Sequence, residues 1–271
     1  MDIQTQAEIE KISNKNQLMP RLRKVFSDPV IVNHILDNNI PLNFGIDLMC
    51  QIALHKRATL QIMVGTLFRH FGEEPENIQQ CIDMITKAAL VDLCSFDELS
   101  GEFVVTVDIP ADVQRDLDRF QYPMPMVVPP RKLKDNRSTA YYTGGGSVIL
   151  QGYNHHSDDV CLDHLNRMNQ VELCLNMDTA RLISNKWSDL DRQKDGESAA
   201  DYKKRVAAFK RYDRNARDVM ELIYVAGNSF YMTHRYDKRG RTYSQGYHIN
   251  PQGNDWSKAV IEFAEGEVIN G

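Results

Sequence analysis

The residues best suited to bind a ligand gather between Tyr231 and Asp255, in the segment YMTHRYDKRGRTYSQGYHINPQGND. Its central charged residues are Arg235, Asp237, Lys238, Arg239 and Arg241. Tyrosines interleave with them, at positions 231, 236, 243 and 247. Cations beside aromatic rings suit a sugar–phosphate backbone with stacked bases, and Gly240 lets a backbone approach a ligand closely. The segment therefore indicates nucleic-acid binding, although a solvated basic turn between two strands has the same composition.

A second group of cations recurs at helical spacing earlier in the chain. Lys203, Lys210, Arg214 and Arg217 follow one another at intervals of seven, four and three residues. This spacing predicts a basic stripe on one helix face, which could lie along a duplex. A solvated helix face explains the same spacing and is the commoner arrangement.

The charge of the chain is unevenly distributed. Residues 203–241 hold eleven Lys/Arg and four Asp/Glu, a balance of +7, and the whole chain carries −5, which leaves −12 for the remainder. Such asymmetry is typical of a local cationic groove in an acidic protein.

The cationic segment requires a strand, a turn and a helix to position its residues. The alternation in RTYSQGYHI predicts a strand that places Arg241 and Tyr243 on one face. Residues 250–254 predict a polar turn. Asn254 or Asp255 is a good N-cap for a helix through WSKAVIEFAEGE, which we expect to reach the chain end.

Residues 158–230 predict two antiparallel helices. The first has an apolar face at helical spacing, formed by Leu165, Met168, Leu175 and Leu182. The polar run around Gly196 predicts a connection. Ser198 is the expected N-cap of the second helix, with Asp201 at the third position after it. The basic stripe lies on this second helix.

Residues 1–120 read as a mostly helical domain without a motif that names a chemistry. The longest helical pattern covers residues 47–71, and a further helix is expected at 75–90. The β-branched run at 103–109 predicts a strand, and a short helix is expected to follow it.

Residues 121–157 predict an extended linker or loop, because each proline of QYPMPMVVPP favours extended geometry in the residue before it. The glycine triplet Gly144–Gly146 could cradle a phosphate. It lacks the GxxxxGK spacing of a nucleotide loop, so a flexible turn is the commoner interpretation.

The composition is that of a globular cytosolic protein. The chain has 271 residues, of which 42% are hydrophobic and 25% charged. Its five cysteines are odd in number and form no CxxC pair, which favours reduced thiols in the cytoplasm. We expect no secretory signal, because the N-terminus MDIQTQAEIEK lacks a basic region followed by an apolar one. We expect no membrane partner, because no apolar run approaches ~18 residues.

Two motifs together resemble the single-subunit DNA-dependent RNA polymerases of phage and mitochondrial type. DKRGRTY at 237–243 is similar to the D-x-x-G-R element of that family, and NPQGND at 250–255 is similar to the turn that follows it. PMVVPPR at 125–131 resembles the segment before the family's thumb, and residues 158–231 resemble the thumb. The resemblance covers roughly residues 121–271 and is closest where both motifs occur in order.

The resemblance implies a mainly α fold with a small β component, organised as part of a right-hand polymerase. Residues 1–120 would form a helical N-terminal domain and 121–157 an extended linker. Residues 158–230 would form a helical-hairpin thumb, and 231–271 the first part of the palm.

The resemblance also implies that this chain acts with a partner. In the family, the carboxylates that hold Mg²⁺ lie downstream of these motifs. We therefore expect no catalytic or metal-binding residue in this chain, and no RNA synthesis without a second polymerase subunit that brings the rest of the palm and the fingers. Such two-chain enzymes occur among bacteriophages, so the expected location is the host bacterial cytoplasm. The expected ligands are the DNA template, the RNA transcript and nucleoside triphosphates.

The residues that match the motifs would contact the template and the RNA–DNA hybrid: Asp237, Arg239, Gly240, Arg241, Tyr243, Gln252, Gly253 and Asn254. The two arginines would bind phosphates, the aspartate would orient an arginine, and Tyr243 would rest on a base or sugar. The last three residues would shape the turn or be structural. Lys203, Lys210, Arg214 and Arg217 would make the thumb contacts. The alternative is a stand-alone nucleic-acid-binding accessory protein without enzymatic activity.

Overall fold

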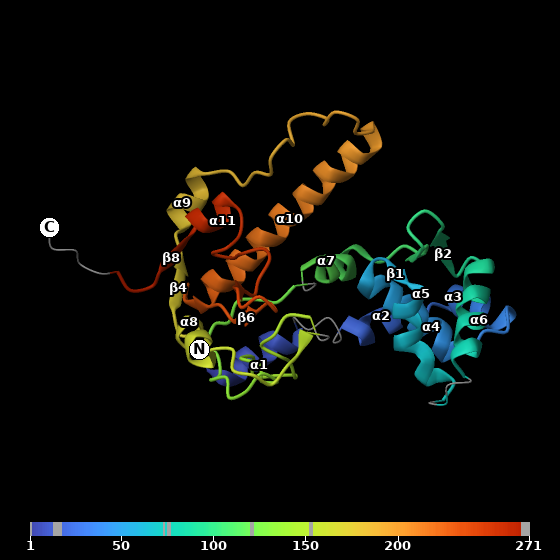
Figure 1. The fold of residues 1–271 in the computed structure, drawn as a ribbon. Helices are drawn as coiled ribbons and strands as arrows, with labels where there is room; N and C mark the ends of the chain where they lie inside the picture. Colours follow the sequence, from blue (N-terminus) through green and yellow to red (C-terminus); the bar gives the residue numbers. More distant parts are fainter. Residues whose placement is uncertain are drawn as a thin grey trace. The chain divides into compact units, whose positions relative to one another are not determined.

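The computed structural model describes residues 2–12, 18–72, 74, 77–119, 122–151 and 154–266 (Figure 1). The chain divides into two compact units, residues 14–117 and residues 1–13 together with 118–271. Helices dominate the regular structure and the sheets are small and antiparallel, so the chain is mainly α with a small β component, as the sequence predicted.

The smaller unit is built around one buried helix, α4. This unit contains α2 (Met19–Phe26), α3 (Pro29–Asp37), α4 (Leu42–His55), β1 (Ala58–Thr59), α5 (Leu60–Leu67), the 3₁₀ turn η2 (Phe68–His70), α6 (Asn77–Leu90), β2 (Cys94–Asp97), β3 (Glu102–Val105) and α7 (Ala111–Arg119). Helix α7 ends just beyond the boundary of the unit. The strands form one antiparallel sheet in the order β1-β3-β2. Ten residues of α4 are buried, because other elements of this unit pack around it.

The single helix predicted at 47–71 is wrong, because the helix is interrupted. Helix α4 ends at His55, and Lys56 has a left-handed φ of 64°. Ala58 and Thr59 then pair with Phe103 and Glu102 of β3, so strand pairing replaces two residues of the expected helix.

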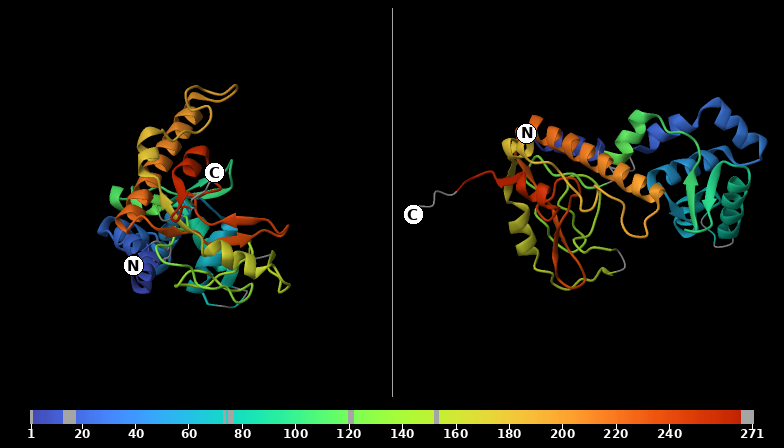
Figure 2. Two further views of the ribbon diagram at one scale, coloured as in Figure 1. Left: turned by 90° about the vertical axis from the view of Figure 1, so that its left-hand side faces the viewer. Right: turned by 90° about the horizontal axis from the view of Figure 1, so that it is seen from above.

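The larger unit contains the longest described helix, α10 (orange in Figures 1 and 2). Its elements are α1 (Ile3–Ile12), α8 (Leu162–Asn169), β4 (Glu172–Leu175), α9 (Met177–Leu182), α10 (Ala199–Val225), β5 (Phe230–Tyr231), β6 (His234–Tyr236), β7 (Thr242–Ser244), α11 (Asp255–Ala259) and β8 (Ile261–Phe263). The strands form a sheet in the order β5-β4-β8 and a separate hairpin, β6-β7.

Only the second of the two long helices predicted at 158–230 exists. Helix α10 begins as expected, with the Ser198 side chain accepting the N–H of Asp201 at 3.1 Å. The first predicted helix is instead α8, strand β4 and α9. Leu173 of β4 pairs with Phe230 on one side and Phe263 on the other, and this burial between two strands overrides the helical spacing.

The segment 121–157, predicted as an extended linker or loop, contains no helix or strand of the described set, and its described residues, 122–151 and 154–157, belong to the larger unit. Met126 exchanges two backbone hydrogen bonds with Tyr231, at 2.9 and 2.7 Å. Leu150 and Val148 bond to the backbone of Tyr236. The segment lies against α1, where the side chain of Gln6 accepts the N–H of Val127 at 2.8 Å (Figure 1). Its prolines interrupt regular pairing, but its apolar side chains are buried.

The helix predicted from residue 255 to the chain end is much shorter. The side chain of Asn254 caps α11 by accepting the N–H of Ser257 at 2.8 Å, but α11 ends at Ala259. Ile261–Phe263 then form β8, which pairs with β4 (Figure 1). In β8, Ile261 is partly buried against the core of the larger unit, whereas Phe263 is 71% exposed. Residues 267–271, which the prediction also included, lie outside the described residues.

Candidate nucleic-acid interface

The turn between β6 and β7 presents the DKRGR residues. Asp237 organises this turn through its backbone and side chain: one carboxylate oxygen accepts the N–H groups of Arg239 at 2.9 Å and Arg241 at 3.0 Å. Gly240 has a φ of +77°, a conformation that glycine adopts without strain, and its N–H bonds to the Asp237 carbonyl. The sequence therefore forms a tight, internally bonded turn in which four of the five residues 237–241 are charged.

Asp237 also holds two arginines. Its second oxygen lies 2.8 Å from Nε and 2.7 Å from Nη2 of Arg241, and 3.4 Å from Nη2 of Arg239. Partial burial acts to raise the pKa of Asp237, but hydrogen bonds from the backbone and guanidinium of Arg241 outweigh it and lower the pKa overall. The arginine side chains remain 53% and 64% exposed, so both can still reach an anion.

The four tyrosines near this turn do not act alike. Tyr243 is half-buried; its hydroxyl donates to Asp237 at 3.3 Å and Arg241 lies over its ring at 5.5 Å. Tyr231 and Tyr236 are buried in the core and cannot stack on a base. Tyr247 is 40% exposed and stacks on Tyr122. Arg235 is half-buried and separate from the Asp237 cluster, so the interleaved surface expected from the sequence is reduced to the turn and Tyr243.

The NPQGND turn packs directly against this hairpin. The amide of Gln252 accepts the N–H of Ser244 at 2.9 Å and donates to the carbonyl of Thr242 at 3.2 Å, so it binds the backbone of β7. Asn250 closes the turn by donating to Gly246 and accepting from Gln252. Both polar ends of Gln252 are occupied in this way, which gives this predicted site residue a positioning role.

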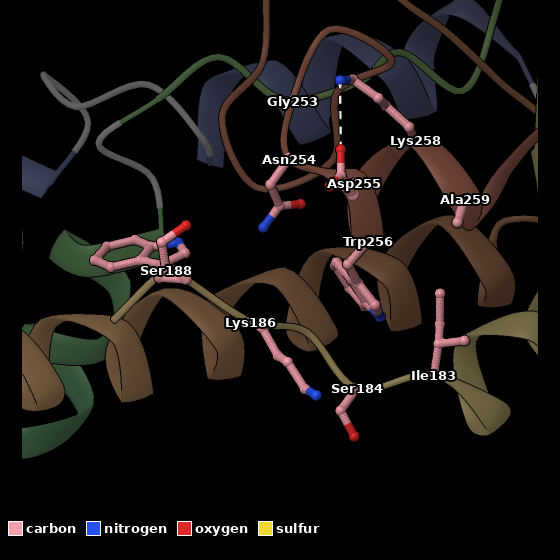
Figure 3. A pocket seen from close by; sticks show the side chains of 11 residues that line it. Ile183, Ser184, Lys186, Ser188, Gly253, Asn254, Asp255, Trp256, Lys258 and Ala259 are labelled. Carbon is pink, nitrogen blue, oxygen red and sulfur yellow. Dashed lines mark ion pairs between the residues drawn. The ribbon is translucent and has the colours of Figure 1, made fainter. Parts of the chain in front are cut away.

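Gly253 and Asn254 line a cavity of about 770 Å³ between the segment 183–188 and helix α11 (Figure 3). A Cβ on Gly253 would lie 2.9 Å from the Asn250 carbonyl oxygen, so the turn requires glycine there. Asn254 caps α11 and donates to the side chain of Asn185 at 2.9 Å, which fastens the turn to the segment on the opposite side of the cavity.

The walls of this cavity carry further groups that suit a polyanion. Lys186 and Lys258 line it, and Lys258 lies 3.7 Å from the fully exposed carboxylate of Asp255 (Figure 3). Trp187 also lines it, and its ring packs at 5.3 Å from Tyr212 of α10. The buried Nε1–H of Trp256 has no acceptor among the described residues. Sequence reasoning missed Lys186 and Trp187, because a lysine and a tryptophan in a polar connection carry no spacing signal.

The predicted basic stripe lies along α10. Lys203, Lys210, Arg214 and Arg217 are all exposed and fall within about 60° of one another around the helix, over about 21 Å of its length. Arg217 is paired with Asp213 at 3.2 Å, and Arg214 lies 4.0 Å from Asp118. Lys203 and Lys210 have no ion-pair partner within the described part of the chain.

No group of three or more potential metal ligands occurs among the described residues. No helix there is both long and apolar enough to cross a membrane. In comparisons with known proteins, no family model matches the chain and no curated protein matches it.

Proposed function

We propose that this chain is a subunit of a DNA-directed RNA polymerase of the single-subunit phage type, in which it grips the template and the RNA–DNA hybrid. The observation that carries the proposal is the pair of hydrogen bonds between Gln252 and β7, one accepted from Ser244 and one donated to Thr242. Through them, the two motifs on which the family resemblance rests are in direct contact. An arginine-bearing hairpin and the NPQGND turn then form one continuous surface.

The chemistry of this surface supports phosphate binding without sequence reading. Arg239 and Arg241 are exposed planar cations whose orientation is set by Asp237, and an arginine can hold a phosphate through two N–H groups. Tyr243 offers a ring edge beside them for a base or sugar. Contacts of this kind position and retain a nucleic acid. In this proposal the basic stripe of α10 acts as the thumb, which keeps the hybrid bound during RNA synthesis.

The partner subunit in this proposal carries the rest of the palm, the fingers and the catalytic aspartates, and binds the nucleoside triphosphates. Mg²⁺ on that partner supplies the electrostatic stabilisation of phosphoryl transfer. The present chain completes the active site by holding the hybrid in place.

Arg241→Ala tests the hybrid contact. We expect it to weaken binding of a short RNA–DNA hybrid roughly tenfold, about 1.4 kcal/mol, and to reduce the salt dependence by about one phosphate contact. Fluorescence anisotropy over a series of salt concentrations measures both. The matched control is Arg167→Ala, which removes another exposed arginine paired with one carboxylate, Asp163, at 2.8 Å. Equal affinities for the two variants would contradict the assignment.

RNA synthesis separates a polymerase subunit from the alternative of an accessory protein. With Mg²⁺, nucleotides and a primed template, the purified chain should make no RNA. Co-expression with a chain from a neighbouring reading frame that supplies the missing carboxylates should restore synthesis, and Arg241→Ala should reduce it. RNA synthesis by the purified chain alone would contradict the proposal that the catalytic residues lie on a partner subunit. If the chain is an accessory binding protein, no RNA should form with or without the co-expressed chain.

A further inference from the structure

A second, smaller cavity lies in the larger unit beside the glycine triplet. Its volume is about 170 Å³, enough for several water molecules. Its polar lining includes Thr139, Gly145, Gly146, Ser147, Arg235 and Gln245. Ser138, Tyr141 and His234 also line it, and burial lowers the pKa of His234 to about 4, so that this ring is neutral near pH 7. No carboxylate lines it among the described residues. The cavity therefore combines one cation with neutral polar groups.

The guanidinium of Arg235 is incompletely satisfied. Its Nη2 donates to the carbonyl of Ile149 at 3.1 Å, but its Nε is buried and has no hydrogen-bond partner. No carboxylate lies within ion-pair distance of it in the described residues. Burial lowers the pKa of Arg235, as expected for a cation removed from water without a counter-charge. A half-buried arginine in this state is destabilising unless an anion completes it.

The glycine triplet supplies further donors to the same cavity. Glu10 fixes the start of the loop, because its carboxylate accepts the N–H groups of Tyr142 at 3.0 Å and Thr143 at 2.6 Å. The following N–H groups, those of Gly145, Gly146 and Ser147, have no acceptor among the described residues. A Cβ on Gly145 would meet no atom within 4 Å, so open space lies beside this backbone.

Gln245 adds a third type of donor. Its side-chain oxygen accepts the hydroxyl of Thr233 at 2.9 Å, which directs its NH₂ group elsewhere, and that NH₂ group has no partner among the described residues. The guanidinium, the backbone N–H groups and this amide are all hydrogen-bond donors. A tetrahedral oxyanion, with acceptors on every side, matches such a set.

We infer that this cavity is a phosphate-binding site, with Arg235 as its cation and the backbone of Gly145–Ser147 as its cradle. The ligand is a single phosphate group, either free or on a nucleic-acid strand. The site is distinct from the Asp237 cluster, and its existence does not depend on the proposed polymerase function.

The test uses the full chain and inorganic phosphate. In ¹⁵N-labelled protein, phosphate replacing chloride at constant ionic strength should shift the amide signals of Gly145 and Gly146 in a saturable manner. Arg235→Met should weaken phosphate binding about tenfold or more, because it removes the charge and keeps the length of the side chain. Gly145→Val should weaken it as well, because it adds bulk beside the N–H groups of the cradle and leaves Arg235 in place.

The control is Arg137→Met, which removes an exposed arginine that does not line the cavity. Its phosphate affinity should stay within about twofold of the original chain. Gly145 has no left-handed φ, so we expect its valine variant to fold. This variant still tests the inference if Arg235→Met fails to fold. The inference would be overturned if all variants responded equally to phosphate. It would also be overturned if glutamate shifted the amide signals of Gly145 and Gly146 and phosphate did not.

A single-stranded oligonucleotide distinguishes the two sources of the phosphate. If Arg235→Met weakens binding of both the oligonucleotide and inorganic phosphate, the site takes a strand phosphate. If it weakens only inorganic phosphate, the site takes a small phosphate anion. Both results uphold the site. If Arg241→Ala loses hybrid binding and keeps its phosphate affinity, the phosphate site is independent of the proposed polymerase function.

Discussion

At Asp237, one carboxylate holds two arginines and still leaves more than half of each arginine side chain exposed. Arg235, only two residues earlier, is half-buried beside a cavity. The difference follows from position in the hairpin: Arg235 lies within β6, whereas Arg239 and Arg241 lie in the turn after it, where their side chains reach solvent. Residues of the same type in one motif therefore acquire different chemistry.

His234 should make the stability of the larger unit depend on pH. Burial, and next the nearby His164, lower its pKa to about 4, and its ring contacts Asn169 at 2.9 Å. The unfolded chain binds this proton near pH 6.5, whereas the folded chain does not until about pH 4. Stability is therefore expected to fall as the pH drops from about 6.5 to about 4, by at most about 3 kcal/mol.

Urea unfolding followed by tryptophan fluorescence at pH 7 and pH 5 measures this loss. His234→Gln can still donate to Asn169 and should make the loss smaller. His156→Gln, a change at a 42% exposed ring, should leave it as it was. An unchanged pH dependence in His234→Gln would contradict the assignment to this residue.

At the scale of elements, α10 differs from its sequence neighbours because its structure depends on local interactions. The Ser198 cap and a long run of helix-compatible residues lie within its own sequence. Strand β4 has the same apolar spacing as a helix, yet it pairs with β5 and β8. The expected thumb hairpin therefore consists of one long helix connected to a helix–strand–helix segment.

Lys203 and Lys210, which have no ion-pair partner among the described residues, should contribute most of the interaction of α10 with nucleic acid. Replacing both Lys203 and Lys210 by Gln should reduce the slope of log affinity against log salt for hybrid binding by about 1.8, roughly 0.9 for each phosphate contact. The control replaces two other exposed lysines, Lys11 and Lys24. Equal slopes for the two double variants would show that the stripe is only a solvated helix face.

At the scale of the molecule, the two units have separate hydrophobic cores. Phe44 is fully buried in the smaller unit and packs against Phe71 at 5.1 Å, whereas Phe230 is fully buried in the larger one. Both tryptophans, Trp187 and Trp256, belong to the larger unit. Tryptophan fluorescence therefore reports on one core, and far-ultraviolet circular dichroism reports on both.

Phe44→Ala should destabilise the smaller unit alone, by roughly 3–5 kcal/mol, because it leaves a cavity in a packed core. The expected result is an earlier unfolding transition by circular dichroism with an unchanged midpoint by tryptophan fluorescence. Phe230→Ala, the matched change in the other core, should shift the fluorescence midpoint. If Phe44→Ala shifts both probes equally, the two units unfold as one.

The amino-acid sequence by itself determined the features that depend on residues three or four apart. These are the caps at Ser198 and Asn254, the register of the α10 stripe and the tight turn at Asp237–Arg241. In the caps and the turn a side chain bonds to a nearby backbone group, and the stripe follows from helical periodicity, so the local sequence is sufficient.

Only the tertiary structure decided which apolar runs became strands, which tyrosines were buried and which groups met across cavities. The runs around Leu173 and Ile261 were expected to be helical, and they form strands because they pair with distant segments of the chain. The sequence pattern does not show whether the side chains of Gln252 and Arg235 bind a ligand or other residues of the protein. Their partners, Thr242 with Ser244 and the open cavity beside the glycine triplet, come from long-range packing that spacing along the chain does not encode.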